Sequence, residues 1–142
     1  MPKDLPLKSK GFNPFGELIG LNFTTQKNGG SQCVLEVSEK HLNPHGTLHG
    51  GVVYAMADTG MGAALYTLLN EQELCATVEI KVTYLQAVLS GTLTCDTKAI
   101  HRGGRLAFLE SEVRNGETLV AKATGTYVIF REHSTQERRN EK

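Results

Sequence analysis

Residues 50–70 read GGVVYAMADTGMGAALYTLLN, and this stretch decides the fold. Apolar and small residues fall on nearly every side of the helix that it predicts over Gly50–Leu69, with Asn70 as the C-terminal cap. A helix without a polar face has to be surrounded by protein. Its length approaches that of a membrane span, but Asp58 and two glycines interrupt it. We therefore expect a buried helix and no association with a membrane.

The sequence after this helix changes its period from 3.6 to two, which predicts strands. Between residues 77 and 85, apolar residues alternate with polar ones, as in a strand of a sheet that is covered on one side. This alternation places Thr77 on the polar face. Further strands are expected at residues 92–100, 106–113 and 119–130, separated by glycine-containing turns.

Two strands are expected before the helix. Residues 17–26 and 31–37 are rich in Phe, Thr and Val, and the Lys27-Asn28-Gly29-Gly30 between them tolerates positive φ, so these segments predict a β-hairpin. The whole order is strand, strand, hydrophobic helix and four strands. This order predicts an α+β fold in which a largely antiparallel sheet wraps one helix.

Length and composition agree with a single domain. The 142 residues are 39% hydrophobic, and equal numbers of acidic and basic residues leave a formal net charge of zero. Because there is no broad basic field, nucleic acid is not an expected partner. We assign residues 16–131 to the domain, residues 1–15 to an N-terminal arm and residues 132–142 to a charged tail. Three distant cysteines and a start without an apolar secretory segment favour a cytoplasmic protein.

Asp58 is the most informative residue, because an ionised carboxylate in an apolar helix is costly unless it is paired or hydrogen-bonded. Two interpretations stay open from physics alone. A shielded carboxylate is what a general base or a nucleophile needs near neutral pH. A structural Asp that meets Lys or Arg at a subunit contact also explains it.

The start of the helix offers a second chemical group. His49-Gly50-Gly51 places the free N–H groups of the first turn where a developing oxyanion could accept from them. Asn43, on the irregular loop before, either orients a water or a substrate carbonyl or closes an Asx turn. Eight residues separate Gly50 from Asp58, which is about 12 Å along a helix. Both can act on one carbon only if two subunits share the site, so this interpretation predicts a dimer.

Other candidate sites carry weaker patterns. Arg102 and Arg105 bracket Gly103-Gly104, a turn that either presents guanidinium and N–H groups to a phosphate or is a solvated hairpin. Three histidines recur every four residues from His41 to His49, but a proline and a glycine lie between them and no carboxylate completes a site. We expect no metal. The motifs of serine hydrolases, dinucleotide-binding folds and nucleoside triphosphatases are missing from the sequence.

Together these motifs resemble the hotdog-fold acyl-CoA thioesterases, in the group of PaaI-like proteins and thioesterase superfamily member 2. The resemblance covers roughly residues 15–130. It rests on Asn43-(x)5-His49-Gly50-Gly51-(x)6-Asp58, on the strand from Ala76 to Tyr84 and on the closing VAKATGTYVIF at residues 120–130. It implies a curved antiparallel sheet around a central helix, assembly as a homodimer and commonly a homotetramer, and binding of coenzyme A esters.

The resemblance also implies roles residue by residue. Asp58 corresponds to the carboxylate that activates water or attacks the thioester carbon, and Gly50 to the helix-start amide that polarises the thioester carbonyl. His49 and Asn43 correspond to positions that help to place the carbonyl and the water. Thr77 stands where relatives often have Ser or Thr in contact with the water.

The leading hypothesis is therefore an acyl-CoA thioesterase that hydrolyses an acyl or aroyl thioester without metal or cofactor. Its candidate contacts to coenzyme A are Gly51, Arg102, Gly103 and Arg105. The alternative is a non-catalytic protein that binds or senses acyl-CoA, and binding without turnover would support it. A third possibility is an assembly subunit in which Asp58 only pairs across an interface.

Overall fold

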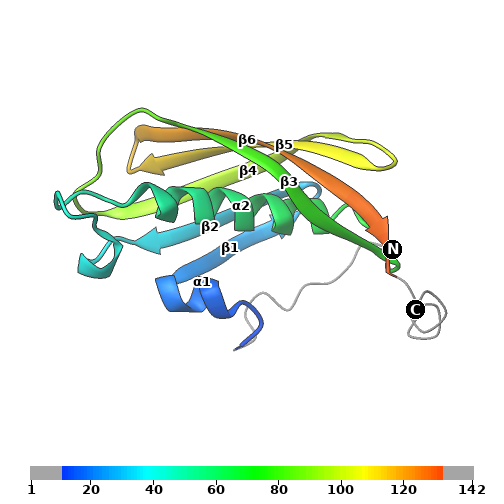
Figure 1. The fold of residues 1–142 in the computed structure, drawn as a ribbon, viewed down its shortest axis with the longest axis horizontal. Helices are drawn as coiled ribbons and strands as arrows, with labels where there is room; N and C mark the ends of the chain where they lie inside the picture. The colour runs from blue at the N-terminus through cyan, green and yellow to red at the C-terminus, as the bar shows by residue number, and fades with distance from the viewer. Residues whose placement is uncertain (1–10, 133–142) are drawn as a thin grey trace.

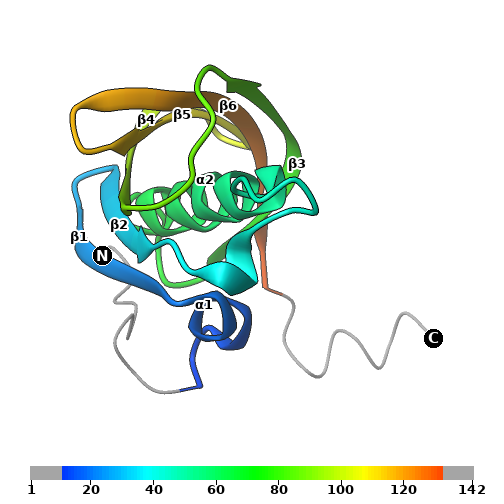
Figure 2. The same ribbon diagram turned by 90° about the vertical axis from the view of Figure 1, so that its left-hand side faces the viewer.

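A computed structural model describes residues 11–132, and its strands form one antiparallel sheet around a long helix. The six strands lie in the order β1-β2-β4-β5-β6-β3, and the sheet curls around α2 (Figure 1, Figure 2). The predicted α+β fold is confirmed. The elements in chain order are α1 (Pro14–Ile19), β1 (Leu21–Lys27), β2 (Gly30–Glu36), the 3-10 helix η1 (Glu39–His41), α2 (Gly50–Tyr66), β3 (Glu73–Tyr84), β4 (Thr92–Arg102), β5 (Leu106–Asn115) and β6 (Thr118–Arg131).

Helix α2 buries one side against the sheet. Ten of its 17 residues are buried, among them Met61 and Leu65. Gly60 lets helix and sheet approach closely, because a Cβ at this position would lie 2.8 Å from Thr97 Oγ1. At the same contact the Ser31 hydroxyl donates to the Gly60 carbonyl oxygen at 2.7 Å. Bulky apolar residues thus fill the space under the sheet, and a glycine is kept where the two layers touch.

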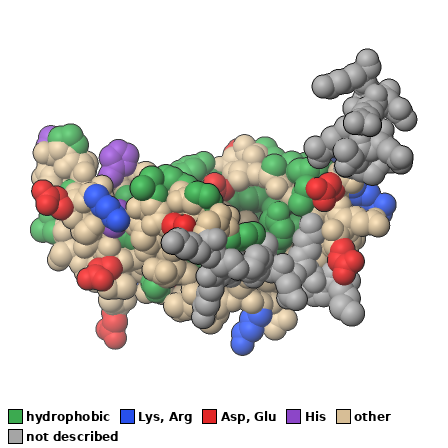
Figure 3. All heavy atoms as spheres, turned by 90° about the horizontal axis from the view of Figure 1, so that it is seen from below, with side chains coloured by type: hydrophobic (Ala, Val, Ile, Leu, Met, Phe, Trp, Pro, Cys, Tyr) green, Lys and Arg blue, Asp and Glu red, His purple; other side chains and the backbone are tan. Residues whose placement is uncertain are grey.

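The other side of α2, called its open side below, is covered only in part by residues 11–132. Gly51 and Tyr54 are exposed, and Asp58 and Gly62 are half-buried. Helix α1 covers a part of this side (Figure 2). Seen from below, apolar side chains lie among charged ones across this face of the molecule (Figure 3). Within residues 11–132, the expectation that protein surrounds α2 is therefore met on its sheet side and only in part on its open side.

The helix α1 was not predicted. Asn13 caps it, since its Oδ1 accepts from the Gly16 N–H at 3.1 Å, and Pro14 takes the first helical position. Gly20 ends the helix in the left-handed conformation, with φ of 78°. These three residues are ordinary start and stop signals of a helix. However, α1 spans only six residues, which is too short to show the apolar period from which a helix is predicted.

The predicted hairpin is present with a different beginning. Its first strand starts at Leu21 instead of Glu17, because α1 takes up the residues before it. The turn at Asn28 and Gly29 is confirmed, and both residues have positive φ. The boundary expected after residue 15 falls inside α1. Most of the predicted arm and nearly all of the predicted tail lie outside the described residues.

Helix α2 ends at Tyr66, three residues earlier than expected. Thr67 ends it: its Oγ1 donates to the Ala64 carbonyl oxygen at 2.7 Å and accepts from the Gly29 N–H at 2.6 Å. The β1–β2 turn thus lies against the end of the helix. The predicted cap at Asn70 is wrong, and the Asn70 N–H donates instead to Glu73 Oε1. Within residues 11–132 no helix is long and apolar enough to cross a membrane.

Strand β3 contains a bulge that interrupts its alternation. Thr77 pairs with Tyr127 and Glu79 pairs with Thr126, so Val78 is the extra residue. Because of this bulge, Thr77 turns toward α2 and not toward the polar face as predicted. Next to this bulge, Thr77 of β3 contacts Asp58 of α2.

Candidate active site

Asp58 lies half-buried on the open side of α2, where two hydroxyl groups hold it. Thr77 Oγ1 donates to Asp58 Oδ1 at 2.7 Å, and the Tyr127 phenol donates to the same oxygen at 2.6 Å. None of the ion pairs formed among residues 11–132 includes Asp58. The carboxylate is therefore stabilised by neutral donors, and a pair with Lys or Arg finds no support in this part of the chain.

The second carboxylate oxygen of Asp58, Oδ2, is open. No described residue donates a hydrogen bond to Oδ2. Within residues 11–132, every buried side-chain nitrogen or oxygen atom has a hydrogen-bond partner. Because Oδ2 has none, it is not buried. Two donors on Oδ1 fix the orientation of the carboxylate. The result is one oriented and accessible oxygen, which is what a general base or a nucleophile requires.

Tyr127, on β6, is a site residue that the sequence did not indicate. It is 2% exposed, and burial followed by the hydrogen bond to Asp58 raises the pKa of its phenol. The phenol therefore keeps its proton and acts as a donor. Its oxygen also lies 2.9 Å from the Asp58 carbonyl oxygen. Alternation along β6 marks Tyr127 as a core residue, but only the bulge in β3 places it across from Thr77.

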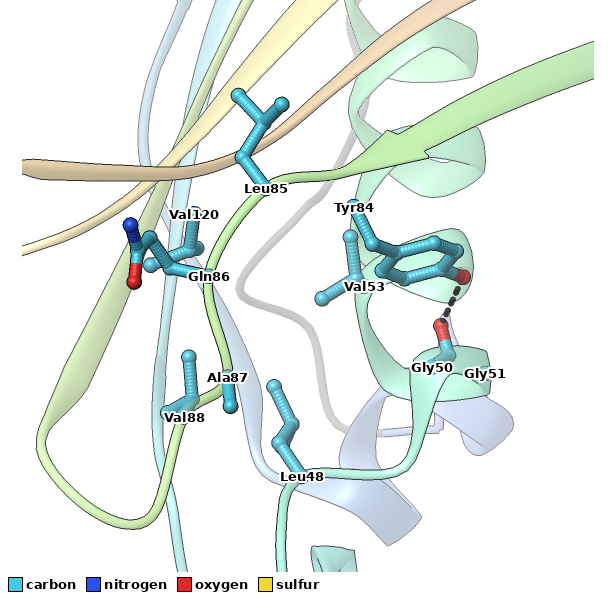
Figure 4. Close-up of a pocket in the computed structure, with 10 residues that line it drawn as sticks. All are labelled: Leu48, Gly50, Gly51, Val53, Tyr84, Leu85, Gln86, Ala87, Val88 and Val120. Carbon is cyan, nitrogen blue, oxygen red and sulfur yellow. Dashed lines mark hydrogen bonds between the residues drawn. The ribbon is translucent and has the colours of Figure 1, made fainter.

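A cavity of about 510 Å³ lies at the start of α2 (Figure 4). Gly50 lines this cavity, and its N–H has no acceptor among the described residues. The Gly51 N–H is occupied, since it donates to His49 Nδ1 at 2.8 Å. Gly50 therefore supplies an open backbone donor at the positive end of the helix dipole.

Tyr84, the last residue of β3, lies over Gly50 in this cavity (Figure 4). Its phenol donates to the Gly50 carbonyl oxygen at 2.7 Å. A Cβ at position 50 would lie 3.0 Å from the phenol oxygen. A side chain at this position would thus press against Tyr84, so the glycine preserves both this contact and access to the N–H.

His49 and Asn43 are engaged in local structure. His49 Nδ1 accepts a backbone N–H, so the neutral ring carries its proton on Nε2. Asn43 Oδ1 accepts from the N–H groups of His45 and Thr47, and its Nδ2 donates to Thr47 Oγ1 at 2.8 Å. Asn43 thus closes the loop that leads into α2, in agreement with the Asx-turn interpretation. Contacts of either side chain with a substrate stay a prediction.

A single chain brings Thr77 to Asp58 but keeps Gly50 away from it. Helix α2 is continuous from Gly50 to Tyr66, so the eight residues between Gly50 and Asp58 correspond to about 12 Å along its axis. One reacting carbon cannot touch both groups of the same chain. A site that uses both needs a second copy, as the sequence indicates.

The predicted contacts to coenzyme A at the β4–β5 turn differ in availability. Arg102 is engaged, because its Nη2 lies 2.6 Å from Glu73 Oε1 and its Nη1 donates to the Gly103 carbonyl oxygen. The Asn70 N–H and then Arg102 hold the pKa of Glu73 below its ordinary value. Arg105 is exposed and forms no ion pair within residues 11–132. It is therefore the available cation of this turn.

The side chains of the three regularly spaced histidines have separate partners, although the His49 N–H donates to the His41 carbonyl oxygen at 2.8 Å. His41 is buried, its Nδ1 accepts from the Ser38 N–H, and its Nε2 lies 2.6 Å from the Ile19 carbonyl oxygen. It joins the loop before α2 to the end of α1. Among residues 11–132 no three His, Cys, Asp or Glu side chains are placed to hold a metal ion.

Comparisons with known proteins give an independent result. The family model described as the thioesterase superfamily matches residues 45–122, more than half of the chain. A protein of Saccharolobus solfataricus is 32% identical over 119 residues, which cover 83% of this chain and 79% of that protein. The 1,4-dihydroxy-2-naphthoyl-CoA hydrolase of Listeria monocytogenes is 31% identical over 87 residues, which cover 61% of this chain and 71% of the relative.

Solved structures share the fold over most of their length. A conserved protein of Pseudomonas aeruginosa has a TM-score of 0.80 at 31% identity, with 87% of this chain and 96% of that chain covered. The phenylacetic acid degradation protein PaaI of Thermus thermophilus has a TM-score of 0.76 at 29% identity, with 81% and 97% covered. With its six-stranded sheet curled around α2, the chain belongs to the thioesterase superfamily and is a hotdog-fold thioester hydrolase.

Proposed function

We propose that this protein hydrolyses coenzyme A thioesters of acyl or aroyl groups to the free acid and coenzyme A. The observation that carries the proposal is the Asp58 carboxylate, which has one oxygen held by two hydroxyls and the other oxygen open. The names of two relatives support the substrate class, because one is a naphthoyl-CoA hydrolase and the other a phenylacetic acid degradation protein.

Asp58 Oδ2 acts at the thioester carbonyl carbon, either by taking a proton from an attacking water or by attacking the carbon itself. In the water route the water oxygen bonds to the carbonyl carbon, one water proton passes to Oδ2, and the carbonyl oxygen becomes an oxyanion. Collapse of this intermediate breaks the C–S bond. The proton on Oδ2 then passes to the leaving thiolate, while Thr77 and Tyr127 keep the carboxylate in place.

The Gly50 N–H donates to the developing oxyanion. This donor is fixed at a helix start before the reaction begins, so it stabilises the transition state without reorganisation. His49 presents Nε2–H beside the same helix start, and Asn43 holds the loop that positions His49. A thioester is an activated acyl donor, so these groups suffice without a metal or a cofactor.

In this proposal the active sites are composite: the protein is a homodimer with two sites, each formed by Asp58 of one copy and Gly50 of the other. Among residues 11–132, the surfaces that lie next to Asp58 and Thr77 are the open side of α2 and the edge of β3, which ends the sheet on that side. We place the second copy against these surfaces, and two such dimers make up the homotetramer that the family resemblance suggests.

The anionic end of coenzyme A lies along the β4–β5 turn in this proposal. Arg105 supplies the charge for a phosphate group, because Arg102 is already paired with Glu73. Arg102 and Gly103 shape the turn and thereby position Arg105. Gly51 contributes to the cavity wall at the start of α2.

The variant Asp58→Asn tests the proposal. We expect kcat on acetyl-, benzoyl- and phenylacetyl-CoA, followed through release of the free thiol, to fall by ~10²- to 10⁴-fold while the fold is retained. Glu117→Gln is the matched control, since Glu117 is an exposed acid in the turn between β5 and β6, and it should leave kcat unchanged. Equal turnover by wild type and Asp58→Asn overturns the proposal. Binding of the esters by wild type without turnover also overturns it, in favour of an acyl-CoA-binding protein.

Tyr127 and Thr77 act as positioning residues, which predicts a split between kcat and KM. Loss of one hydrogen bond to a charged group corresponds to roughly 10- to 100-fold, so Tyr127→Phe and Thr77→Val should lower kcat by this amount with little change in KM. Thr77→Ser keeps the hydroxyl and should restore kcat. A parallel rise of KM in both variants would instead indicate a general disturbance of the pocket.

A further inference from the structure

A second cavity, of about 300 Å³, lies between α1, β1 and α2. Phe12 lines it from the segment before α1, Phe23 from β1, and Thr59, Gly62 and Tyr66 from α2. It lies beside the open side of α2, where α1 and the edge strand β1 border it. Neither the proposed chemistry at Asp58 nor the cavity at Gly50 accounts for it.

This cavity begins next to the reactive carboxylate of the proposed function. Thr59 follows Asp58 in the sequence, and Gly62 lies about one helical turn after Asp58. Residues four apart are neighbours on a helix surface, about 6 Å apart along the axis. A group bound to a carbon at Asp58 Oδ2 therefore reaches the cavity by passing over Gly62.

Gly62 keeps this passage open at a cost to the helix. A glycine inside a helix is about 1 kcal/mol less favourable than alanine. At Gly60 the close contact with Thr97 explains the glycine, but a Cβ at Gly62 would meet nothing within 4 Å. No described residue of the chain thus requires a glycine at position 62. Residues 11–132 leave the space above Gly62 unfilled.

The residues that line the cavity indicate the chemical class of its ligand. Three aromatic rings, those of Phe12, Phe23 and Tyr66, face one space, and Thr59 and Tyr66 add hydroxyl groups. Among the described residues no Lys or Arg lines the cavity, and its charged group is the Glu17 carboxylate. An acidic wall disfavours the phosphates of coenzyme A and suits an uncharged group. The volume is at the lower end of small-molecule pockets, suited to about one ring system.

We propose that this cavity between α1 and α2 receives the acyl group of the thioester, an uncharged aromatic group, and that Gly62 is its entrance from Asp58. The inference rests on the proposed function. It places the two halves of the substrate on opposite sides of the reacting carbon. The aromatic acyl group lies toward α1, and the coenzyme A part leads away toward the positive charge at Arg105.

The ratio of kcat/KM for phenylacetyl-CoA to kcat/KM for acetyl-CoA tests the inference. Gly62→Leu fills the entrance and should lower this ratio at least ~10-fold. Phe12→Ala removes one aromatic wall and should lower it by roughly 3- to 10-fold. Phe15→Ala is the matched control: Phe15 is in α1, is 57% exposed and does not line the cavity, so the ratio should stay as in wild type.

A binding measurement gives a readout that does not depend on turnover. Phenylacetamide, an uncharged compound that carries the same aromatic group, should bind the wild-type protein in ligand-observed NMR and should bind Gly62→Leu at least ~10-fold more weakly. Size-exclusion chromatography of each variant shows whether the oligomer is retained.

The outcomes separate the inference from the proposed function. If Asp58→Asn loses turnover but Gly62→Leu and Phe12→Ala keep the wild-type ratio, the acyl group lies elsewhere and the inference is overturned alone. If Gly62→Leu dissociates the oligomer and lowers kcat/KM equally for phenylacetyl-CoA and acetyl-CoA, the second copy occupies the space above Gly62. The inference is then overturned as well. If Asp58→Asn is as active as wild type, the proposed function itself fails.

Discussion

Gly60 and Gly62 are two residues apart on α2, yet they face different surroundings. A Cβ at Gly60 would lie 2.8 Å from Thr97 Oγ1, whereas a Cβ at Gly62 would meet nothing within 4 Å. The same contrast holds for the two sides of the helix. The sheet side is filled by side chains of this chain, and the open side carries a carboxylate with an accessible oxygen. Packing within residues 11–132 accounts for the first side, and the proposed substrate and second copy would lie against the other.

The largest expected effect tests whether each active site combines Gly50 of one copy with Asp58 of another. Gly50→Pro removes the N–H at a helix position that accepts proline, and His49 before it already has the extended φ of −64° and ψ of 130° that proline favours. Gly50→Pro and Asp58→Asn should each lose at least ~10²-fold in kcat. Co-expressed, the two variants should recover about a quarter of wild-type activity, because half of randomly formed dimers are mixed and each has one intact site.

Gly50→Ala is the matched control for this experiment. It adds the same Cβ against Tyr84 but keeps the N–H, so its kcat should exceed that of Gly50→Pro. Recovery of activity in mixed dimers indicates a site shared between two copies, because a site formed within one chain would stay inactive in both variants. If mixed dimers are isolated through two different tags and remain inactive, Gly50 and Asp58 do not form a composite site.

The sheet side should respond in stability and not in chemistry. Leu65 is 0% exposed on α2, so Leu65→Ala should lower the free energy of unfolding by about 2–5 kcal/mol in urea titrations. Its kcat/KM per folded protein should stay close to that of wild type. Leu18→Ala is the matched control, since Leu18 is 71% exposed on α1 and should change stability by less than about 0.5 kcal/mol. Equal effects of both variants would contradict the assignment of stability to the sheet side.

Burial against the sheet also explains which elements could be predicted from the sequence. The apolar run of α2 and the period-two segments after it give the main elements, because their patterns reflect burial against one sheet. Helix α1 is missed although Asn13, Pro14 and Gly20 mark its ends, since so short a helix has no period of its own. The end of α2 is set by Thr67, whose contact with Gly29 comes from a turn 38 residues away.

The candidate site was predictable where residues act through the local chain. Gly50 and Asp58 are fixed by one helix, so their spacing already shows that they cannot meet within a chain. Tyr127 could not be found, because its contact with Asp58 depends on the pairing of β3 with β6. Strict alternation assigned Thr77 to the wrong face, because a bulge at Val78 has no marker in the local sequence.

The two glycines give a matched pair of substitutions with opposite signs. Gly60→Ala places a methyl group against Thr97 in a close-packed contact and should destabilise the fold by about 1–3 kcal/mol. Gly62→Ala has room and gains helix propensity, so it should stabilise the fold by about 0.4–1 kcal/mol. Thermal and urea unfolding at one protein concentration measure both. Destabilisation by Gly62→Ala would mean that the second copy fills the space directly above Gly62, which contradicts its use as an entrance for the acyl group.

The smallest expected effect concerns Tyr127, which joins the two sides by reaching from the sheet to Asp58. Burial, followed by its hydrogen bond to Asp58, raises the pKa of Tyr127 in the folded protein, whereas a tyrosine in the unfolded chain titrates near about 10. Stability from this group is therefore complete below pH of about 10 and is lost as the pH rises toward the folded pKa. Between pH 9 and 10.5 the wild type should lose about 0.8 kcal/mol more than Tyr127→Phe does. Urea titrations of both proteins at the two pH values test this, and the other tyrosines cancel because both proteins contain them. A wild type and a Tyr127→Phe variant with the same pH dependence would show that the phenol is not held in its protonated form against Asp58.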